Sequence, residues 1–468
     1  MRRTKIVATI GPACESTEKV RQMLQAGVDV VRLNFSHGDH SEHERSLRTV
    51  RQVAEELRMT VGVLQDLSGP KIRIGPLQGE TVYLRRGARF VLTTNPILGN
   101  DREVSVSYKG LPGDVKPGDT LLLADGALSL QVDEIRSQEI VCRVTAGGDL
   151  SSHQGVNFPG GVLHTEGFTE KDREDLDCGM ALGVDWVALS FVREARDVAR
   201  VKDLLHARGA EIPVIAKIEK HEALLCLDEI LDASDGAMVA RGDLGVEIPL
   251  EQVPWVQKQI IEKCRERSKP VITATHMLRS MVSQPRPTRA EAGDVTTAVL
   301  DGTDAVMLSE ETAVGNYPVE SVAVMARIAE MADSHRNREG IFQERKCRGS
   351  IPDAISHAAC VLAQELQVKA ILTPTSSGST SRRISSFRPA QPILAMSQDS
   401  RVLRRLALSW GVTPVAIPQE ASVEELISTA VSVACSRKFV QKGEKIVVTS
   451  GVPLGVPGTT NMIEVLEA

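Results

Sequence analysis

The chain has 468 residues, of which 42% are hydrophobic and 25% are charged, a composition typical of folded globular proteins. It carries 55 lysine and arginine residues against 61 aspartate and glutamate residues, and the net charge of −6 has the wrong sign for binding nucleic acid or an anionic membrane. No apolar run is long enough to span a membrane, and the eight cysteines are scattered without a CxxC pair. We therefore expect a soluble, cytoplasmic protein of several domains, with reduced thiols and with neither nucleic acid nor membrane as a partner.

Short apolar runs of strand length alternate with segments of helical spacing, such as 251–267. This alternation predicts βα units and a parallel sheet. Eight runs predict a closed (β/α)8 barrel, whose usual size is roughly 250 residues. The runs are 5–11, 28–36, 60–67, 184–192, 213–220, 236–243, 270–275 and 305–310.

The alternation stops between the third and fourth runs. From about residue 71 to residue 169 the chain has the pattern of short strands and tight turns, which predicts a small all-β domain inserted into the barrel. Segments 121–124 and 127–130 flank Asp125-Gly126, a dipeptide typical of a two-residue hairpin turn.

A C-terminal α/β domain is expected after a charged stretch at 334–350, because helix and strand patterns alternate again there. Its expected strands are 368–373, 392–397, 412–417 and 445–450. The expected domains are a barrel formed by 1–70 and 170–345, an inserted β-barrel lid at 71–169 and an α/β regulatory domain at 346–468.

Charged side chains gather at the ends of three predicted strands, and in this barrel class the carboxyl ends of the strands carry the active site. Alternate strand residues face the same way. The residues that share a face in this manner are Arg32, Asn34 and Ser36 on the second run, Lys217 and Glu219 on the fifth, and Arg241 and Asp243 on the sixth. Solvated strand ends or structural ion pairs would explain one such end, but three ends with cations and carboxylates together favour a functional site.

The mixture of charges indicates phosphoryl transfer. Glu219 and Asp243 match Mg²⁺, which takes one or two protein carboxylates and completes its shell with water and phosphate oxygens. Arg32 and Lys217 supply positive charge for an anionic substrate, and the backbone N–H groups of Gly242 and Asp243 could hold a carboxylate or phosphate. The chain has neither a GxxxxGK[ST] loop nor a GxGxxG loop. Metal, cations and amides are the groups with which proteins catalyse phosphoryl transfer.

Seven motifs lie in order along the chain. They are KIVATIGP at 5–12, RLNFSHG at 32–38, AKIEK at 216–220, MVARGDLGVEIP at 238–249, ATHML at 274–278, PRPTRAE at 285–291 and MLSEET at 307–312. Together they resemble the pyruvate kinase family, and the resemblance extends over the inserted and C-terminal domains. It implies transfer of the phosphoryl group of phosphoenolpyruvate to ADP, followed by protonation of enolpyruvate to pyruvate.

The resemblance also implies a role for each site residue. Glu219 and Asp243 would ligate Mg²⁺, with Mn²⁺ as an alternative, Lys217 would neutralise the phosphoryl group in flight and Arg32 would hold its oxygens. The further implied roles are carboxylate binding by Gly242, Asp243 and Thr275, protonation through Thr275, Ser309 and water, and nucleotide-phosphate binding by Asn34, His37 and Arg73. Taken alone, Thr275 and Ser309 would be explained better by strand-end capping, and the motif context is what favours the functional role.

Lys71 departs from the commonest form of the family. Many pyruvate kinases that need K⁺ carry glutamate at this position, whereas a second branch that does not need the ion carries lysine. A tethered ammonium supplies the same charge as a bound K⁺. We therefore predict an enzyme that does not require K⁺, with Lys71 near Asn34, Ser36 and Asp66. The alternative is a solvated surface lysine.

Gln154 is a second departure, because the family usually has a basic residue immediately before Gly-Val-Asn. A cationic contact to the nucleotide is then missing, for which a protonated His153 could compensate in part.

A hydroxyl-rich loop in the C-terminal domain could bind a phosphate through side chains and backbone N–H groups. Its residues are Thr375, Ser376, Ser377, Gly378, Ser379 and Thr380. In the family this region binds a phosphorylated allosteric effector, and the Gly/Pro-rich segment 451–460 could close over it. A helix cap without a ligand is an equal alternative.

The resemblance also implies a homotetramer and a β domain that closes as a lid over the active site. Two rival functions remain open at this stage. One is another phosphoenolpyruvate-using barrel enzyme with a different acceptor, and the other is a non-catalytic effector-binding relative.

Overall fold

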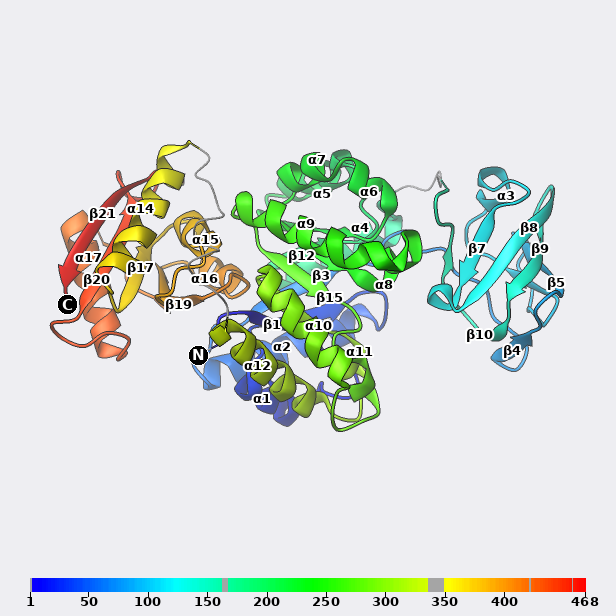
Figure 1. Ribbon diagram of the computed structural model, residues 1–468, viewed down its shortest axis with the longest axis horizontal. Coiled ribbons are helices and arrows are strands. Elements are labelled where there is room, and N and C mark those ends of the chain that lie inside the picture. Colours follow the sequence, from blue (N-terminus) through cyan, green and yellow to red (C-terminus); the bar gives the residue numbers. More distant parts are fainter. Residues whose placement is uncertain (1, 162–166, 336–348, 421, 457) are drawn as a thin grey trace.

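The computed structural model describes residues 2–161, 167–335, 349–420, 422–456 and 458–468. Figure 1 shows three lobes in a row, with a barrel at the centre, a lobe of strands on one side and an α/β lobe that ends in the C-terminus on the other. Across these described ranges, no helix combines the length and the apolar character needed to cross a membrane.

The central lobe is a closed barrel of parallel strands in the order β1-β16-β15-β14-β13-β12-β3-β2. All eight predicted runs form its strands, which confirms the predicted (β/α)8 fold. Each strand ends one to three residues before the predicted run does, so Ser36 and Glu219 lie beyond the strand ends. Arg32, Asn34 and Lys217 lie within β2 and β13. The strands are β1 (Lys5–Thr9), β2 (Val30–Asn34), β3 (Gly62–Asp66), β12 (Trp186–Leu189), β13 (Val214–Ile218), β14 (Gly236–Ala240), β15 (Val271–Ala274) and β16 (Ala305–Leu308).

Helices surround this barrel, and local sequence explains where several of them begin. Asp39, Thr169 and Thr288 each form a capping box with the residue three positions later, which satisfies free N–H groups of the first turn. The helices that cover the outside of the barrel are α1 (Thr17–Ala26), α2 (His40–Glu56), α4 (Glu170–Leu182), α5 (Ala195–Ala207), α7 (Leu227–Ala233), α9 (Val253–Glu266), α10 (Arg289–Asp301) and α12 (Pro318–His335). Three short helices, α6 (His221–Leu225), α8 (Arg241–Glu247) and α11 (Glu310–Ala313), follow barrel strands directly.

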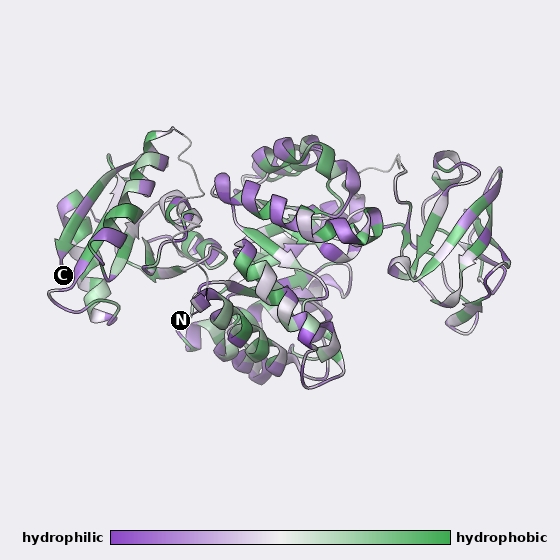
Figure 2. Cartoon of the chain, in the orientation of Figure 1, coloured by the Kyte–Doolittle hydropathy of each residue, from purple (hydrophilic) through white to green (hydrophobic). Residues whose placement is uncertain are grey.

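Alternate strand residues of the barrel belong to two apolar clusters. One cluster, with Leu33 and Val187, packs against the helices, and the other, with Val30 and Trp186, fills the barrel. The inner cluster also contains Leu408 of the C-terminal lobe. In Figure 2 the strands are predominantly hydrophobic, whereas the surrounding helices also carry hydrophilic residues. The hydrophobic effect therefore stabilises the barrel on both faces of its sheet.

The β lobe is the inserted all-β domain that the sequence predicts. It contains a six-stranded sheet in the order β11-β7-β8-β9-β5-β6 and a two-stranded sheet β10-β4. The predicted hairpin joins β7 to β8, but Leu123 pairs with Leu128, so four residues, including the 3-10 turn η1 (Ala124–Gly126), replace the expected two-residue turn. The elements are β4 (Thr81–Leu84), β5 (Arg89–Thr93), β6 (Glu103–Ser105), α3 (Leu111–Asp114), β7 (Thr120–Leu123), β8 (Leu128–Arg136), β9 (Glu139–Ala146), β10 (Gly148–Ser151) and β11 (Val156–Asn157).

The C-terminal lobe is an α/β domain with a five-stranded sheet in the order β19-β18-β17-β20-β21. Its four predicted strands are present, and β21 adds an antiparallel edge strand that was not predicted. The strands are β17 (Ala370–Pro374), β18 (Ile393–Ser397), β19 (Val412–Ala416), β20 (Lys445–Gly451) and β21 (Thr460–Glu467), and the helices are α14 (Ile351–Glu365), α15 (Ser379–Ser386), α16 (Ser400–Leu406) and α17 (Val423–Ser436). The expected boundary at 345 lies outside the described residues.

Candidate active site

Lys217 lies at the centre of an ion-pair network where β13 approaches the barrel mouth. Its Nζ lies 2.9 Å from Oε1 of Glu219 and 3.2 Å from Oδ1 of Asp66, and it donates a hydrogen bond to Oγ of Ser190 at 2.7 Å. Burial would lower the pKa of Lys217, but the charges of Asp66 and Glu219 outweigh it and raise the pKa. The ammonium therefore stays charged at neutral pH.

Arg32 pairs with Asp66, one of the two carboxylates that contact Lys217. Its Nε donates to Oδ2 of Asp66 at 2.6 Å, and its Nη1 donates to Oγ1 of Thr9 at 3.0 Å. Burial would raise the pKa of Asp66, but Lys217 and Arg32 outweigh burial and lower it. Asp66 thus holds two cations side by side at the barrel mouth, where an anionic group can meet both.

Glu219 and Asp243 provide two neighbouring carboxylates. The Glu219 side chain is 1% exposed, and its Oε2 accepts a hydrogen bond from the N–H of Phe191 at 2.7 Å. Burial and the charge of Asp243 raise the pKa of Glu219, against the opposing effect of Lys217. Two carboxylates that repel each other in a buried site fit a hard divalent cation, because such a cation neutralises both.

A cavity of about 140 Å³ brings together several of the predicted substrate-binding residues. Gly242, Asp243, Thr275 and Ser309 all line it, and so does Lys71. The backbone of Thr275 is left-handed, with φ +66°, and its Oγ1 accepts a hydrogen bond from the N–H of Gly242 at 2.7 Å. A hydroxyl and a backbone amide therefore face the same small space as the carboxylate of Asp243.

The expectation that Arg241 and Asp243 extend a strand is wrong. The strand β14 ends at Ala240, and both residues belong to α8. The Arg241 guanidinium donates to Oδ1 of Asp294 at 2.6 Å and to the carbonyl oxygen of Thr275 at 2.9 Å. Arg241 thus fixes the backbone of Thr275 and α10 instead of projecting beside Asp243.

Lys71 lies 3.0 Å from Oδ1 of Asp243 and 4.0 Å from Oδ1 of Asp125, measured from its Nζ. Asp125 belongs to the hairpin connection of the β lobe, so Lys71 links that connection to the barrel mouth. Contacts of Lys71 with Asn34, Ser36 or Asp66 are not found within the described ranges, and its predicted role as a replacement for K⁺ stays a prediction.

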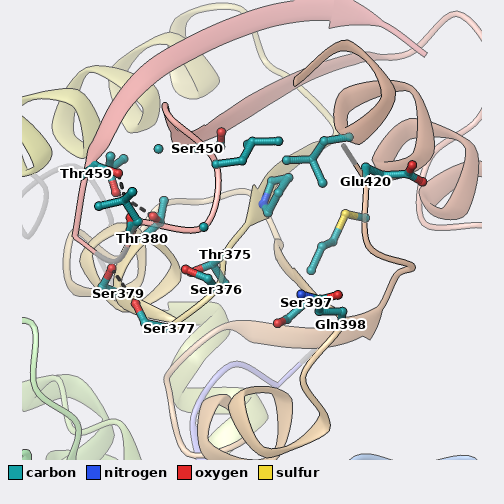
Figure 3. Close-up of a pocket in the computed structure, with 18 of the residues that line it drawn as sticks. Thr375, Ser376, Ser377, Ser379, Thr380, Ser397, Gln398, Glu420, Ser450 and Thr459 are labelled. Atoms are coloured by element: carbon teal, nitrogen blue, oxygen red, sulfur yellow. Dashed lines mark hydrogen bonds between the residues drawn. The ribbon is translucent and has the colours of Figure 1, made fainter. Parts of the chain in front are cut away.

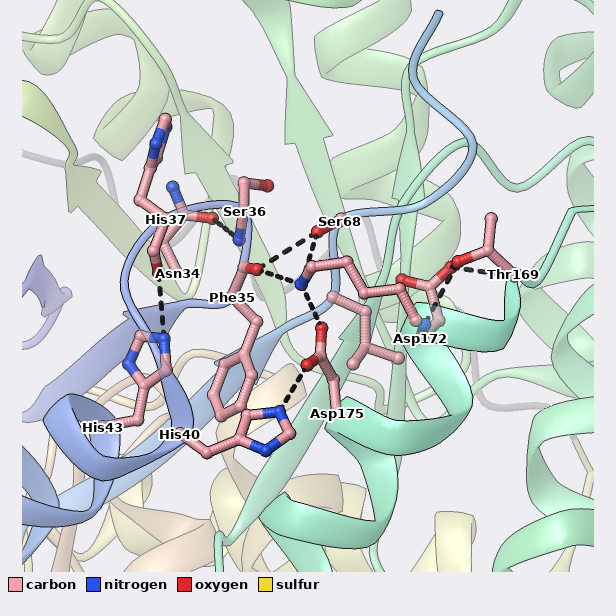
Figure 4. A network of polar contacts seen from close by, with 12 residues as sticks. Asn34, Phe35, Ser36, His37, His40, His43, Ser68, Thr169, Asp172 and Asp175 are labelled. Carbon is pink, nitrogen blue, oxygen red and sulfur yellow. Dashed lines mark hydrogen bonds and ion pairs between the residues drawn. The ribbon is translucent and has the colours of Figure 1, made fainter. Parts of the chain in front are cut away.

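The end of β2 and the loop after it carry the predicted nucleotide contacts Asn34 and His37. Figure 4 shows how this loop is fixed from α4. Lys171 donates to the carbonyl oxygen of Phe35 at 2.7 Å and pairs with Asp175 at 2.6 Å. The Asn34 side chain accepts a hydrogen bond from the N–H of Ser36 at 3.2 Å, which shapes the turn locally.

Arg73 approaches this loop from the β lobe. Partial desolvation of the His37 ring, together with the charges of Arg73 and Arg32, lowers the pKa of His37. The Nη1 of Arg73 donates to the carbonyl oxygen of His153 at 3.1 Å. The predicted nucleotide-binding residues therefore come from two lobes that meet at the barrel mouth.

Three residues that support the site were missed by the sequence analysis: Thr9, Ser190 and Glu311. Glu311 is buried and accepts hydrogen bonds from the N–H groups of Ser309 at 2.7 Å and of Leu278 at 3.0 Å. Thr9 and Ser190 could have been identified from the sequence, because they are polar residues near the ends of the first and fourth predicted runs. The role of Glu311 depends on a contact between two loops that are distant in sequence.

Comparison with known proteins decides the family. The description "Pyruvate kinase, barrel domain" matches residues 1–322, and "Pyruvate kinase, alpha/beta domain" matches residues 353–466. The chain belongs to the pyruvate kinase family.

Relatives with this name match almost the whole chain. It is 49% identical over 468 residues to "Pyruvate kinase 2" of Synechocystis sp., covering 99% of this chain and 79% of the relative. It is 46% identical over 469 residues to the pyruvate kinase of Geobacillus stearothermophilus, covering 99% and 80%. A pyruvate kinase of Clostridium acetobutylicum is 44% identical, covering 99% of both chains. This similarity favours the pyruvate kinase assignment over the rival barrel enzyme and the non-catalytic relative.

The predicted effector loop of this pyruvate kinase family member lines a cavity of about 360 Å³ (Figure 3). Gly378 has φ +80° immediately before α15, and its N–H donates to Oγ1 of Thr375 at 2.9 Å. Thr380 and Thr460 share a hydrogen bond of 2.6 Å. Within the segment 451–460, residues 451, 454–456 and 458–460 line the same cavity, and Pro457 lies outside the described residues.

Proposed function

We propose that this chain transfers the phosphoryl group of phosphoenolpyruvate to ADP and forms ATP and pyruvate. The observation that carries the proposal is the network in which Asp66 and Glu219 hold Arg32 and Lys217 at the barrel mouth. These four charges lie beside a cavity lined by Asp243, which offers a second carboxylate.

The two cations act on the phosphoryl group. Because Asp66 and Glu219 fix their positions in advance, Lys217 and Arg32 neutralise negative charge on the transferring oxygens without reorganisation. Glu219 and Asp243 would hold Mg²⁺, or Mn²⁺ in its place, and the bound ion would neutralise and orient phosphate oxygens. The Asp243 amide, together with the Thr275 hydroxyl and the Gly242 amide that bonds to it, would orient the substrate carboxylate.

Protonation of enolpyruvate is assigned to the same cavity. The Thr275 hydroxyl donates to the carbonyl oxygen of Ala274 at 2.7 Å, and Ser309 lines the cavity as well. We propose that both hydroxyls, together with water, carry a proton to the substrate carbon. Asn34 and His37, together with Arg73, would bind the phosphates of ADP.

Lys71 is proposed to supply the charge that K⁺ supplies in other members of the family. Its position in the active-site cavity, with 24% of the side chain exposed, supports this role over that of a solvated surface lysine.

We also propose an effector site, a homotetrameric assembly and a cytoplasmic location. The loop of Thr375 and its neighbours would bind a phosphorylated effector. Homotetramer formation is supported by Leu250 and Trp255, each 74% exposed, because a subunit contact would bury such large apolar side chains. The free thiols found in the described residues are compatible with a cytoplasmic location.

We also propose that the chain is divided into three domains. The barrel would comprise 1–70 and 170–345, the lid 71–169 and the regulatory domain 346–468. Supporting observations are that β3 ends at Asp66, β4 begins at Thr81 and α4 begins at Glu170.

Pyruvate formation from phosphoenolpyruvate, ADP and Mg²⁺ tests the reaction, with tetramethylammonium as the sole monovalent cation. We expect turnover that added K⁺ barely changes, and we expect Lys71→Glu to make turnover depend on K⁺. The exposed Lys116→Glu is the matched control. Wild-type turnover that appears solely with K⁺ would contradict the role of Lys71, whereas no pyruvate under either condition would contradict the proposed reaction.

Lys217→Met separates catalysis from substrate binding. Because Lys217 acts on charge that develops during transfer, we expect kcat to fall by at least about 100-fold while phosphoenolpyruvate still binds with Mg²⁺. Steady-state kinetics and equilibrium binding measure the two effects. Lys202→Met, on α5, is the control, and turnover that survives in Lys217→Met would refute the assignment.

A further inference from the structure

His221, Glu222 and Glu247 bring three potential metal ligands together beside the barrel mouth, apart from the residues assigned above. His221 and Glu222 open α6, and Glu247 ends α8. One ligand atom of each side chain lies within 4.8 Å of the other two. Both helices lie on the side of the barrel that faces the β lobe (Figure 1).

The polar atoms of this group are buried and incompletely satisfied. Nδ1 of His221 and Oε2 of Glu222 lie 3.0 Å apart as an ion pair, and Oε2 of Glu247 has no hydrogen-bond donor among the described residues. The Glu247 side chain is 1% exposed, so its free oxygen has no access to bulk water. Because an unpartnered buried carboxylate oxygen is costly, the free Oε2 of Glu247 beside the His221–Glu222 pair indicates a position for a cation.

Lys220 orients the Glu247 carboxylate from the other side. Its Nζ donates to Oε1 of Glu247 at 2.6 Å, which leaves Oε2 available. Carboxylates that ligate metals are commonly held by such an outer hydrogen bond. The lysine therefore stabilises the ligand without occupying the position of the metal.

The donor set selects the class of metal. One imidazole nitrogen and two carboxylate oxygens suit Zn²⁺ and similar transition-metal ions, whereas Mg²⁺ prefers oxygen ligands alone. Nδ1 of His221 lies 3.0 Å from Oε2 of Glu222. Ligands about 2.0–2.2 Å from a tetrahedral zinc ion lie about 3.3–3.6 Å apart, so a small separation of these two atoms would admit the ion.

There is space for a water ligand beside Glu222. A cavity of about 30 Å³ borders Lys220 and Glu222, and Asn157 of the β lobe lines it as well. A water molecule needs about 10–15 Å³ of such space.

We propose that His221, Glu222 and Glu247 bind one Zn²⁺ ion, or a similar transition-metal dication, at a site separate from the Glu219–Asp243 pair. The ion would tie the start of α6 to the end of α8. Because α8 begins beside Asp243 and packs against the hairpin connection η1 of the β lobe, the bound ion would hold this part of the barrel mouth rigid.

Zinc binding is measured on the full chain after removal of metals with a chelator. The protein is incubated with Zn²⁺ in an excess of Mg²⁺, which keeps the oxygen-only Glu219–Asp243 pair occupied, and bound zinc is then determined by elemental analysis. We expect one zinc ion per chain and an upward shift of Tm. His221→Ala and Glu222→Gln should each weaken binding by at least about 100-fold, since loss of an outer-shell partner alone costs about 10–100-fold.

The controls make the inference independent of the proposed reaction. His335→Ala removes an exposed histidine at the end of α12 and should bind zinc like the wild type. Lys217→Met should also bind one zinc ion, whether or not the chain forms pyruvate. Absence of zinc from the wild type in excess Mg²⁺, or full retention of zinc by His221→Ala and Glu222→Gln, would overturn the proposal.

Discussion

Asp66 explains how two cations can share the barrel mouth. Its two oxygens bind different partners, with Oδ2 2.6 Å from Nε of Arg32 and Oδ1 3.2 Å from Nζ of Lys217. The pKa of Asp66 is lowered because these two cations outweigh burial. The Asp66 carboxylate therefore stays ionised at neutral pH. The stability that it contributes is fully present above the pKa of Asp66 in the unfolded chain, and it is lost as the pH falls through the lower pKa of Asp66 in the folded protein.

Asp66→Asn should move the alkaline limb of the pH profile. The charge of Asp66 contributes to the raised pKa of Lys217, so its removal lowers that pKa. The protonated, active form of Lys217 is then lost at a lower pH, and kcat should decline earlier on the alkaline side. Steady-state kinetics across the pH range test this. The exposed carboxylate of Asp203 on α5 gives the control Asp203→Asn, and an unmoved alkaline limb in Asp66→Asn would contradict the coupling.

At this scale the sequence predicts residue types more reliably than contacts. Lys217 and Glu219 were identified because they lie at the end of β13, in the strand and directly after it, and this end could be estimated. Arg241 was misplaced because the strand pattern was extended into α8, where Gly242 and Gly245 give little local signal for a helix. The contacts of Glu311 could not be predicted, since they join loops that meet only in the folded barrel.

At the scale of elements, the motif PRPTRAE is explained by the start of α10. Thr288 accepts a hydrogen bond from the N–H of Glu291, and the Glu291 carboxylate accepts one from the N–H of Thr288 at 2.7 Å. Glu291 also accepts from the N–H of Ser280 at 2.7 Å, which joins the loop after β15 to this helix. The motif therefore stabilises the helix whose Asp294 holds Arg241.

Thr288→Ala should lower the free energy of unfolding by about 1 kcal/mol, because it removes one half of the capping box. Urea denaturation measures the change. Thr297→Ala, on the same helix, is the matched control, since the Thr297 hydroxyl bonds within the helix to the carbonyl oxygen of Gly293. Equal losses in the two variants would show that the cap has no special role.

The eight barrel strands could be predicted because both faces of the sheet are buried, so each strand is a continuous apolar run. The edge strand β21 could not, because most of its residues are exposed or half-buried and its sequence has no such run. The position of the hairpin at Asp125-Gly126 was predicted correctly, but the length of its connection was not. The connection is longer than two residues because the left-handed backbone extends from Ala124 to Gly126.

At the scale of the whole molecule, the C-terminal lobe closes the end of the barrel opposite the active site. Leu408 is fully buried and belongs to the apolar cluster that fills the barrel. Arg388 pairs with Asp304 at 3.1 Å, and the N–H of Trp410 donates to the same Asp304 oxygen at 3.1 Å. Apolar burial and shared hydrogen bonds therefore couple the two lobes.

Leu408→Ala should destabilise both lobes and not the C-terminal lobe alone. Truncation of a buried leucine leaves a cavity and costs about 2–5 kcal/mol, and this cavity would open against Val30 and Trp186 inside the barrel. Hydrogen exchange under native conditions measures the effect in each lobe: amides of β1 and β16 should lose protection together with those of β17 and β18. Leu98→Ala, at a leucine 62% exposed in the β lobe, is the control. If the barrel amides keep their protection while those of the C-terminal sheet lose it, the lobes unfold separately and Leu408 does not couple them.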